Sequence, residues 1–590
     1  MEAGVKARQL LLVLGLVLAL RLPFLDQAVQ GDDPVYLAEA SHALIEPLHP
    51  DHVEYVFRGR DVDLRGLTHP PLDGWMLAGL LAVFGSAKEI PFHLAYLTFS
   101  LAAAAAMWSL ARRFSADPLW ATLLFLAVPA FVVNGTSFET DVPFVAFWMA
   151  AIALFCADRL ALAAGAMVLA SLTAYQTVVL IPILAVYCWL YRRRSRAHWL
   201  TLSVPAAVLA AWQIFERVST GALPAGVLSG YFTIYQTVQA KLVNALALSA
   251  HFWFLIFPAL VPFALALAWR KRREPRTQFL VAWIAIFFAS ALVIFFAGSA
   301  RYLLPIAAPM AMLAAGLPKR WLAIGLALQM TLSLGLAVMN YQHWNAYRAY
   351  AASLAPVIEN HRVWVDDEWG LRHYMEDLGA LPLTKTQHLG AGDIVVSSQL
   401  SHAVEPAALL APAAPALEIQ PAIPLRLIGL ETHSGYSSAA FDRLWPFGIS
   451  AGLIDRVRTS RVVERHPTLS YLDLKAPGAK DQIVSGIWPN DHWMSASGVV
   501  IVKSPPAAMP LSVSFYVPDN APARHITMLL DDHEVCAKTV AAPGPGELTC
   551  PSPIAPTVPT ATIEIRVDKT FRVPPDERDL GIVLLGVGFR

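Results

Sequence analysis

Residues 7–25 read ARQLLLVLGLVLALRLPFL, and a short polar segment with two adjacent carboxylates, GDDPVY (residues 31–36), follows them. An apolar run of this length spans a bilayer as one helix, since a crossing needs about 17 to 25 residues. Lys6 and Arg8 lie at the N-terminal end of the run and no small-residue cleavage site follows it, so the sequence predicts an uncleaved signal anchor. The acidic pair is therefore expected at the membrane surface, where a carboxylate is costly to desolvate and is a functional candidate.

The composition extends this prediction to the whole chain. Its 590 residues are 56% hydrophobic and 15% charged, with a mean hydropathy of +0.50, which is too apolar for a soluble globular protein. The formal net charge is zero, so the chain lacks the basic field of a nucleic-acid-binding protein. Further runs of bilayer-spanning length lie at 91–111, 117–134, 142–158, 198–215, 248–269, 277–297, 302–317 and 321–339, and a longer run lies at 161–190.

Clusters of lysine and arginine set the predicted topology, since cytoplasmic loops collect these residues. Placing every cluster inside requires residues 161–190 to form two short helices that meet near 173–176, which gives about eleven spans. The short run 75–84 is then an interfacial helix on the outer surface. The clusters are Lys6/Arg8, Arg112/Arg113, Arg159, residues 192–196, residues 270–273 and Lys319/Arg320.

The predicted membrane region covers residues 1–340. After it the composition changes: the proportion of proline and polar residues increases, and long apolar runs are no longer found. Short strand-like and helix-like segments predict a small α/β domain over residues 341–475. Alternating runs separated by Pro/Gly turns predict a β-sandwich over residues 476–590. Cys536 and Cys550 lie in this polar region, where an even pair predicts a disulfide in an oxidising compartment.

Several polar side chains are expected on the predicted outer face. An ordinary structural role explains them as well as a functional one does. The Gly-Asp-Asp-Pro segment is also good turn chemistry, an arginine at a helix end also snorkels, and a histidine beside the interfacial helix also caps it. A tyrosine at the tip of two short helices is also a common interfacial anchor. The candidates are Asp32, Asp33, His69, Glu139, Asp141, Tyr175, Gln176, His251 and Arg301.

Four motifs in this order resemble the GT-C glycosyltransferases, and most closely the branch of the protein O-mannosyltransferases and the lipid A aminoarabinose transferases. They are the acidic pair at 32–33, HPPL (69–72) before a short helix ending in Phe84-Gly85, TDVP (140–143), and RYLLP (301–305). The resemblance covers roughly residues 1–340. In the sandwich, GIWP (486–489) and DLGI (579–582) resemble jelly-roll modules appended to some bacterial glycosyltransferases.

The resemblance implies a polyprenyl-phosphate sugar donor and gives roles to residues by position. Asp32 matches the first-loop acid, the proposed general base, with Asp33 beside it, and Asp141 matches the second outer-loop acid. Tyr36 falls where the aminoarabinose branch has a tyrosine, whereas Val35 replaces that branch's arginine and His69 its lysine, which leaves the sugar open. Independently, the departing phosphate needs cationic or hydrogen-bonding partners, for which the candidates are Arg301, His69 and Arg58 or Arg65.

The sequence therefore predicts an inverting membrane glycosyltransferase of a bacterial inner membrane, with a cytoplasmic N-terminus and a periplasmic C-terminal region. The acceptor is a glycan, a lipid or a protein hydroxyl. The resemblance implies no cofactor, although Asp32, Asp33 and Asp141 are oxygen ligands that suit a divalent cation. The alternatives are a lipid or sugar transporter or flippase, which predicts polar broken helices and internal repeats, and a membrane-anchored glycan-binding scaffold.

Overall fold

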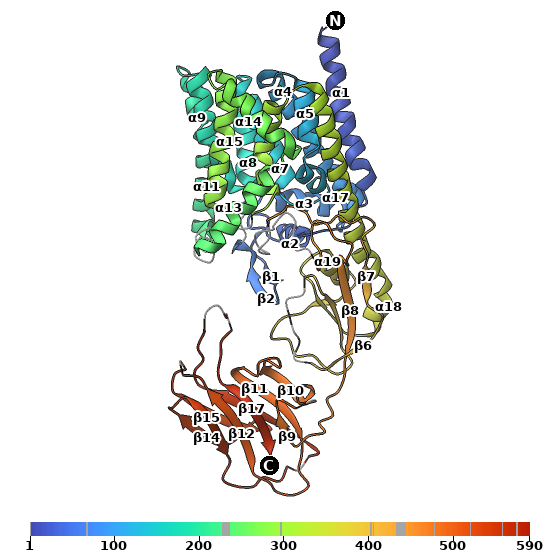
Figure 1. Ribbon diagram of the computed structural model, residues 1–590, viewed down its shortest axis with the longest axis vertical. Helices are drawn as coiled ribbons and strands as arrows, with labels where there is room; N and C mark the ends of the chain where they lie inside the picture. The colour runs from blue at the N-terminus through green and yellow to red at the C-terminus, as the bar shows by residue number, and fades with distance from the viewer. Residues whose placement is uncertain are drawn as a thin grey trace.

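The computed structural model describes residues 2–66, 69–226, 237–294, 298–401, 404, 406, 408–431, 444–476, 478–519, 521–556, 558–573, 576 and 578–590, with the side chains of 2–6 and Gly66 excepted. Residues 295–297, the end of one predicted apolar run, lie outside this set. The helical bundle occupies one end of the long axis, and the sheet-rich C-terminal region continues from it to the other end (Figure 1).

The bundle follows the predicted runs closely. In the part of the chain that the structure describes, five helical segments are long and apolar enough to cross a membrane, and six shorter apolar helices accompany them. Residues 161–190 form two short helices, as predicted, with a 3-10 turn between them. The helices of the bundle are α1 (Glu2–Arg21), α4 (Glu89–Phe114), α7 (Asp141–Cys156), α8 (Leu160–Thr173), α9 (Leu180–Tyr191), α10 (Arg196–Thr201), α11 (Val204–Ser219), α15 (Pro275–Ile294), α16 (Leu304–Ala314) and α17 (Lys319–Ser353).

The predicted run 198–215 is divided between α10 and α11. Two further runs are divided, and proline lies at both of these divisions. The run 117–134 forms α5 (Pro118–Leu126) and α6 (Pro129–Asn134). The run 248–269 is divided between α13 (Val238–Phe252) and α14 (Val261–Arg270), with a 3-10 turn that begins at Pro258. Proline has no N–H to donate and its ring clashes with the carbonyl four residues earlier, so it favours a kink or a break in a helix.

A thin layer lies between the bundle and the C-terminal region (Figure 1). It contains α2 (Asp33–Ala43), the hairpin of β1 (Glu54–Phe57) and β2 (Arg60–Asp63), and α3 (Leu72–Phe84), the predicted interfacial helix. Helices α2 and α3 share an apolar core with the start of α4, formed by residues such as Leu37, Leu77 and Phe92. This packing fixes α2, and with it the acidic pair, at one end of the bundle.

The segment after the bundle is a mixed sheet with two helices. Its strands are β3 (Val363–Asp366), β4 (Leu381–Pro382), β5 (Ile394–Ser398), β6 (Leu410–Pro412), β7 (Leu417–Ile419) and β8 (Asp455–Val462), in the order β4-β3-β5-β8-β6 with β7 also on β8. β4, β3 and β5 are parallel, and β8 runs antiparallel to β5. The end of α17, α18 (Ala355–Asn360) and α19 (Gly370–Asp377) accompany the sheet. Trp344 and Tyr347 of α17 pack in the same core as Leu371 of α19.

The last segment is two antiparallel sheets that enclose one apolar core. One sheet has the order β10-β11-β16-β13-β14 and the other β15-β12-β17-β9. Cys536 of β14 and Cys550, which follows β15, form a disulfide with Cα atoms 5.4 Å apart, and it joins an edge of one sheet to an edge of the other. The strands are β9 (Tyr471–Asp473), β10 (Ile483–Ile487), β11 (Met494–Lys503), β12 (Leu511–Val517), β13 (Arg524–Leu530), β14 (His533–Val540), β15 (Gly544–Thr549), β16 (Thr560–Val567) and β17 (Val583–Phe589).

Candidate functional site

Arg301 lies at the centre of a carboxylate cluster formed by three distant parts of the chain. Its guanidinium forms an ion pair with Glu139 and lies 3.4 Å from an oxygen of Asp32 and 3.6 Å from an oxygen of Asp141. Arg301 begins a 3-10 turn before α16, Asp141 begins α7, and Asp32 immediately precedes α2. The structure thus brings together four of the residues that the sequence singles out.

Negative charges outnumber positive charges in this cluster, because three carboxylates face one guanidinium. The side chains of Glu139 and Asp141 are 8% and 14% exposed, and that of Arg301 is 16% exposed. A charge buried to this extent needs a paired partner to offset its lost hydration. Arg301 supplies that partner, and the surplus negative charge of the cluster makes its surroundings favourable for a proton or a cation.

The two adjacent aspartates have different environments. The Asp32 side chain is 46% exposed and makes no cap hydrogen bond to α2. Asp33 is fully buried and accepts hydrogen bonds from the Ser137 hydroxyl (2.7 Å) and the backbone N–H groups of Phe138 (2.8 Å) and Gln30 (3.0 Å). Asp32 is therefore accessible to a substrate, whereas Asp33 holds two loops together.

Replacing Asp33 with asparagine is expected to lower stability more than activity. One oxygen of Asp33 accepts from Ser137 and Phe138 and the other from Gln30, so an amide nitrogen in place of the second oxygen faces the Gln30 N–H. A buried donor left without an acceptor costs about 1–3 kcal/mol. We expect a lower apparent Tm with transfer activity per folded molecule within about threefold of the parent. An unchanged Tm together with lost activity would contradict this structural role.

The segment that precedes α2 depends on a glycine. Gly31 has a φ of +47°, a conformation that disfavours side chains, and a Cβ added there would lie 3.0 Å from a carboxylate oxygen of Glu139. Gly31 therefore lets the backbone before Asp32 approach the Glu139 carboxylate. Asp141 is also held, since the Asn134 amide donates a hydrogen bond of 3.3 Å to it.

His69 and Tyr36 lie beside the cluster. Their ring centroids are 5.9 Å apart, and His69 Nδ1 is 3.4 Å from the Thr140 hydroxyl, which neighbours both Glu139 and Asp141 in the chain. Burial, with the nearby Arg301 charge, lowers the pKa of His69 to about 4. At neutral pH His69 is therefore an uncharged hydrogen-bonding group and not a cation.

The lowered pKa of His69 predicts a pH effect on stability. The imidazole is neutral in the folded chain down to about pH 4, whereas in the unfolded chain it takes up a proton near its ordinary value of 6.5. Acidification between these values therefore favours unfolding. We expect His69→Gln to lose less apparent Tm than the parent on going from about pH 7 to about pH 5. Equal losses in the two proteins would contradict an uncharged His69 in the folded chain.

The described contacts of the other predicted residues are with side chains other than Arg301. Arg65 pairs with Asp63, and Arg58 lies in the turn between β1 and β2, where its backbone N–H donates to Glu368 (2.8 Å). His251 is buried in α13. Tyr175 and Gln176 lie in the 3-10 turn between α8 and α9, and the Tyr175 hydroxyl accepts a hydrogen bond of 3.0 Å from Gln213.

The C-terminal region holds the backbone just before the acidic pair. The N–H of Ala28 donates to Asn345 of α17 (3.0 Å), and the N–H of Val29 donates to the hydroxyl of Tyr374 of α19 (2.8 Å). Gly370 at the start of α19 packs so closely on the carbonyl of Val29 that a Cβ there would overlap it. The C-terminal region therefore contributes directly to the position of the loop that carries Asp32.

Sequence reasoning missed several residues of this site. Ser137 and Asn134 precede the predicted Glu139 and Asp141 in one polar stretch, NGTS (134–137), and this proximity was a usable signal. Sequence reasoning also missed a group of three potential metal ligands, His49, His52 and Glu216. The first two are three residues apart, but nothing in the sequence places Glu216 beside them.

Comparison with known proteins gives one family match and several distant structural likenesses. Residues 68–216 match the model of the dolichyl-phosphate-mannose-protein mannosyltransferase family. No curated protein matches the chain significantly. The crystal structure of ArnT from Cupriavidus metallidurans bound to undecaprenyl phosphate aligns at 16% identity with a TM-score of 0.45, over 67% of this chain and 93% of ArnT. The mycobacterial arabinofuranosyltransferase AftD aligns at 11% identity with a TM-score of 0.37, over 98% of this chain and 61% of AftD.

Proposed function

We propose that this chain, a polytopic membrane protein of the GT-C glycosyltransferase type, transfers a sugar from a polyprenyl-phosphate-linked donor to a hydroxyl acceptor at the outer membrane surface. The family-model match confirms the resemblance that the sequence motifs predict, within residues 68–216. The donor class follows the family description and the undecaprenyl phosphate in the ArnT crystal structure. The proposed setting is a bacterial inner membrane, with the N-terminus in the cytoplasm and the C-terminal region in the periplasm.

One observation carries the proposal: Asp32 presents a half-exposed carboxylate beside Arg301, which is 16% exposed. In the proposed reaction Asp32 takes the proton of the acceptor hydroxyl, whose oxygen attacks the anomeric carbon of the sugar. The bond between that carbon and the phosphate oxygen breaks, and the polyprenyl phosphate leaves with the electron pair. A single displacement of this kind inverts the anomeric configuration.

The leaving phosphate needs positive charge and hydrogen-bond donors when the bond breaks. Arg301 is the cation that we assign to this role, because its guanidinium has several donors and lies beside Asp32. His69, which is neutral, is assigned a hydrogen bond and no charge. Arg301 offsets one of the three negative charges of Asp32, Glu139 and Asp141, and the sensitivity of transfer to a chelator tests whether a divalent cation offsets the rest.

The proposal is tested with the purified full chain in liposomes that contain one polyprenyl-phosphate sugar at a time. The donors carry mannose, glucose, galactose, arabinose or aminoarabinose, and the acceptors are water, a simple glycoside and a serine peptide. The readout is release of free polyprenyl phosphate and appearance of the glycosylated acceptor by mass spectrometry. We expect turnover with at least one donor and none with heat-denatured protein. Transport of an intact lipid-linked sugar across the bilayer, without cleavage of any donor, would favour the flippase alternative.

A further inference from the structure

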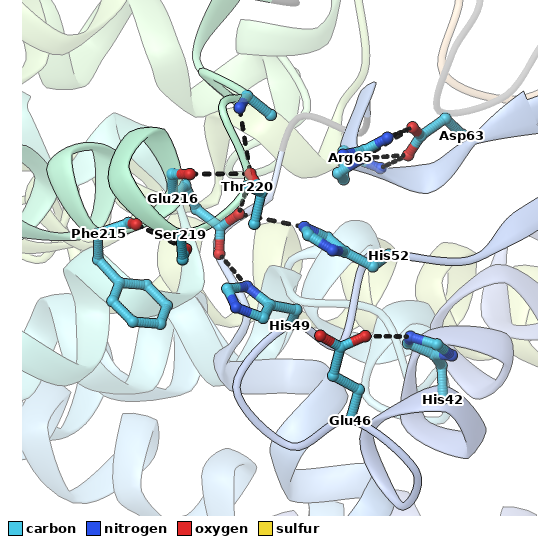
Figure 2. Close-up of polar contacts among 11 residues, drawn as sticks. His42, Glu46, His49, His52, Asp63, Arg65, Phe215, Glu216, Ser219 and Thr220 are labelled. Atoms are coloured by element: carbon cyan, nitrogen blue, oxygen red, sulfur yellow. Dashed lines mark hydrogen bonds and ion pairs between the residues drawn. The ribbon is translucent and has the colours of Figure 1, made fainter.

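A second polar cluster lies at the same end of the bundle and shares no residue with the Arg301 site. His49 and His52 belong to the connection between α2 and β1, and Glu216 lies in the last turn of α11 (Figure 2). His49 Nδ1 is 3.0 Å from one carboxylate oxygen of Glu216, and His52 Nε2 is 3.3 Å from the other. One nitrogen of each histidine and a carboxylate oxygen lie within 4.8 Å of one another.

The burial of these side chains is unusual for an ordinary ion pair. Glu216 is fully buried, and the side chains of His49 and His52 are 11% and 16% exposed. The two imidazole rings are stacked with centroids 4.5 Å apart, an arrangement in which two positive charges would repel each other. A buried carboxylate needs positive charge to offset its lost hydration, and a divalent cation held by both rings would supply it.

Neighbouring side chains increase the negative charge around the cluster. Asp51 lies within electrostatic range of Glu216 and both histidines, is 6% exposed, and has one buried carboxylate oxygen without a hydrogen-bond partner among the described residues. Arg65 is also within range of Glu216, but its guanidinium is occupied by Asp63. Among the described residues, Glu216 therefore lies against two imidazole nitrogens with Asp51 nearby, and neither acid forms an ion pair with an arginine or lysine, which is the environment of a metal site.

We propose that His49, His52 and Glu216 bind a zinc ion, through Nδ1, Nε2 and a carboxylate oxygen respectively. Two imidazoles and one carboxylate are a ligand set typical of zinc, with a fourth position open to another group. Calcium and magnesium prefer oxygen ligands alone and fit this set poorly. The second oxygen of Glu216 and the carboxylate of Asp51 add negative charge near the ion.

The expected role of the ion follows from the elements that it joins. It would join the connection after α2 to the C-terminal end of α11. Helix α2 begins next to Asp32. A metal that crosslinks distant elements stabilises the folded chain by its binding free energy. The proposal concerns binding and stability, so its outcome is independent of whether the chain transfers sugar.

The test measures zinc on the full chain, purified in detergent with a tag that contains no histidine. The protein is dialysed against zinc sulfate, freed of unbound metal and analysed by mass spectrometry for metal and protein. We expect about one zinc per chain, X-ray absorption with imidazole nitrogens at about 2.0 Å, and a higher apparent Tm that a chelator reverses. His49→Ala/His52→Ala and Glu216→Gln are expected to lower bound zinc at least about tenfold.

His42→Ala is the matched control, because His42 lies in the same region, pairs with Glu46 at 3.5 Å and is not a proposed ligand. It is expected to keep the zinc content of the parent. Glu216→Gln preserves the shape of the side chain and guards against misfolding, which size-exclusion chromatography checks for every variant. Less than about a tenth of a zinc per chain in the parent, full zinc content in Glu216→Gln, or equal competition by magnesium would each overturn the proposal.

Discussion

The Asp32→Asn variant is expected to transfer sugar at least about a hundredfold more slowly than the parent at neutral pH, because an amide cannot accept the proton of the acceptor hydroxyl. The folded structure is expected to depend little on this carboxylate: the Asp32 side chain is 46% exposed and makes no cap hydrogen bond, and without it Arg301 keeps Glu139 and Asp141 as partners. The loss is therefore expected in the rate of the chemical step, with little change in donor binding or apparent Tm. Single-turnover release of polyprenyl phosphate in liposomes measures it.

A matched control separates this effect from a general loss of surface charge. Asp158 is 50% exposed and pairs with Arg192 at 2.6 Å, so Asp158→Asn also removes one half-exposed carboxylate beside an arginine. It follows α7, at the end of that helix opposite Asp141. We expect Asp158→Asn to retain parental activity. If both variants retain the parental rate, Asp32 is not the general base.

The comparison of Asp32 with Asp33 shows what the sequence could and could not predict here. The motif places both acids at the outer surface, and the structure places both beside the loop that contains Glu139 and Asp141. The sequence around Asp32 and Asp33 does not show which of the two side chains is buried. The burial of Asp33 depends on Ser137 and Phe138, which lie more than a hundred positions away in the chain. The division of roles between the two acids therefore needs the tertiary structure.

The helical bundle was more predictable than the site for a physical reason. The length of an apolar run and the distribution of basic residues are local properties, and a bilayer turns them into helices and a topology. They predicted the two short helices on either side of the turn at 175–179. Ligand sets such as His49, His52 and Glu216 depend on the packing of α11 against the connection between α2 and β1, which no local pattern encodes.

Removing the Arg301 guanidinium is expected to affect both stability and catalysis. Arg301→Gln leaves Glu139 and Asp141, which are 8% and 14% exposed, without their cationic partner, and breaking such a buried pair costs about 3–5 kcal/mol. The same change removes the cation that we assign to the leaving phosphate, so a loss of about a hundredfold to a thousandfold in rate is expected. Arg192→Gln is the matched control, since Arg192 pairs with Asp158 (2.6 Å) and is 31% exposed.

A double variant separates the two effects of Arg301. In Arg301→Gln/Glu139→Gln the amide of residue 139 no longer needs a cation, so part of the lost stability is expected to return. The rate of sugar transfer is expected to stay low, because the leaving phosphate still lacks its positive partner. Apparent Tm and single-turnover rates of the parent, both single variants and the double variant form one cycle. If activity returns together with stability, Arg301 serves only to hold the carboxylates in place.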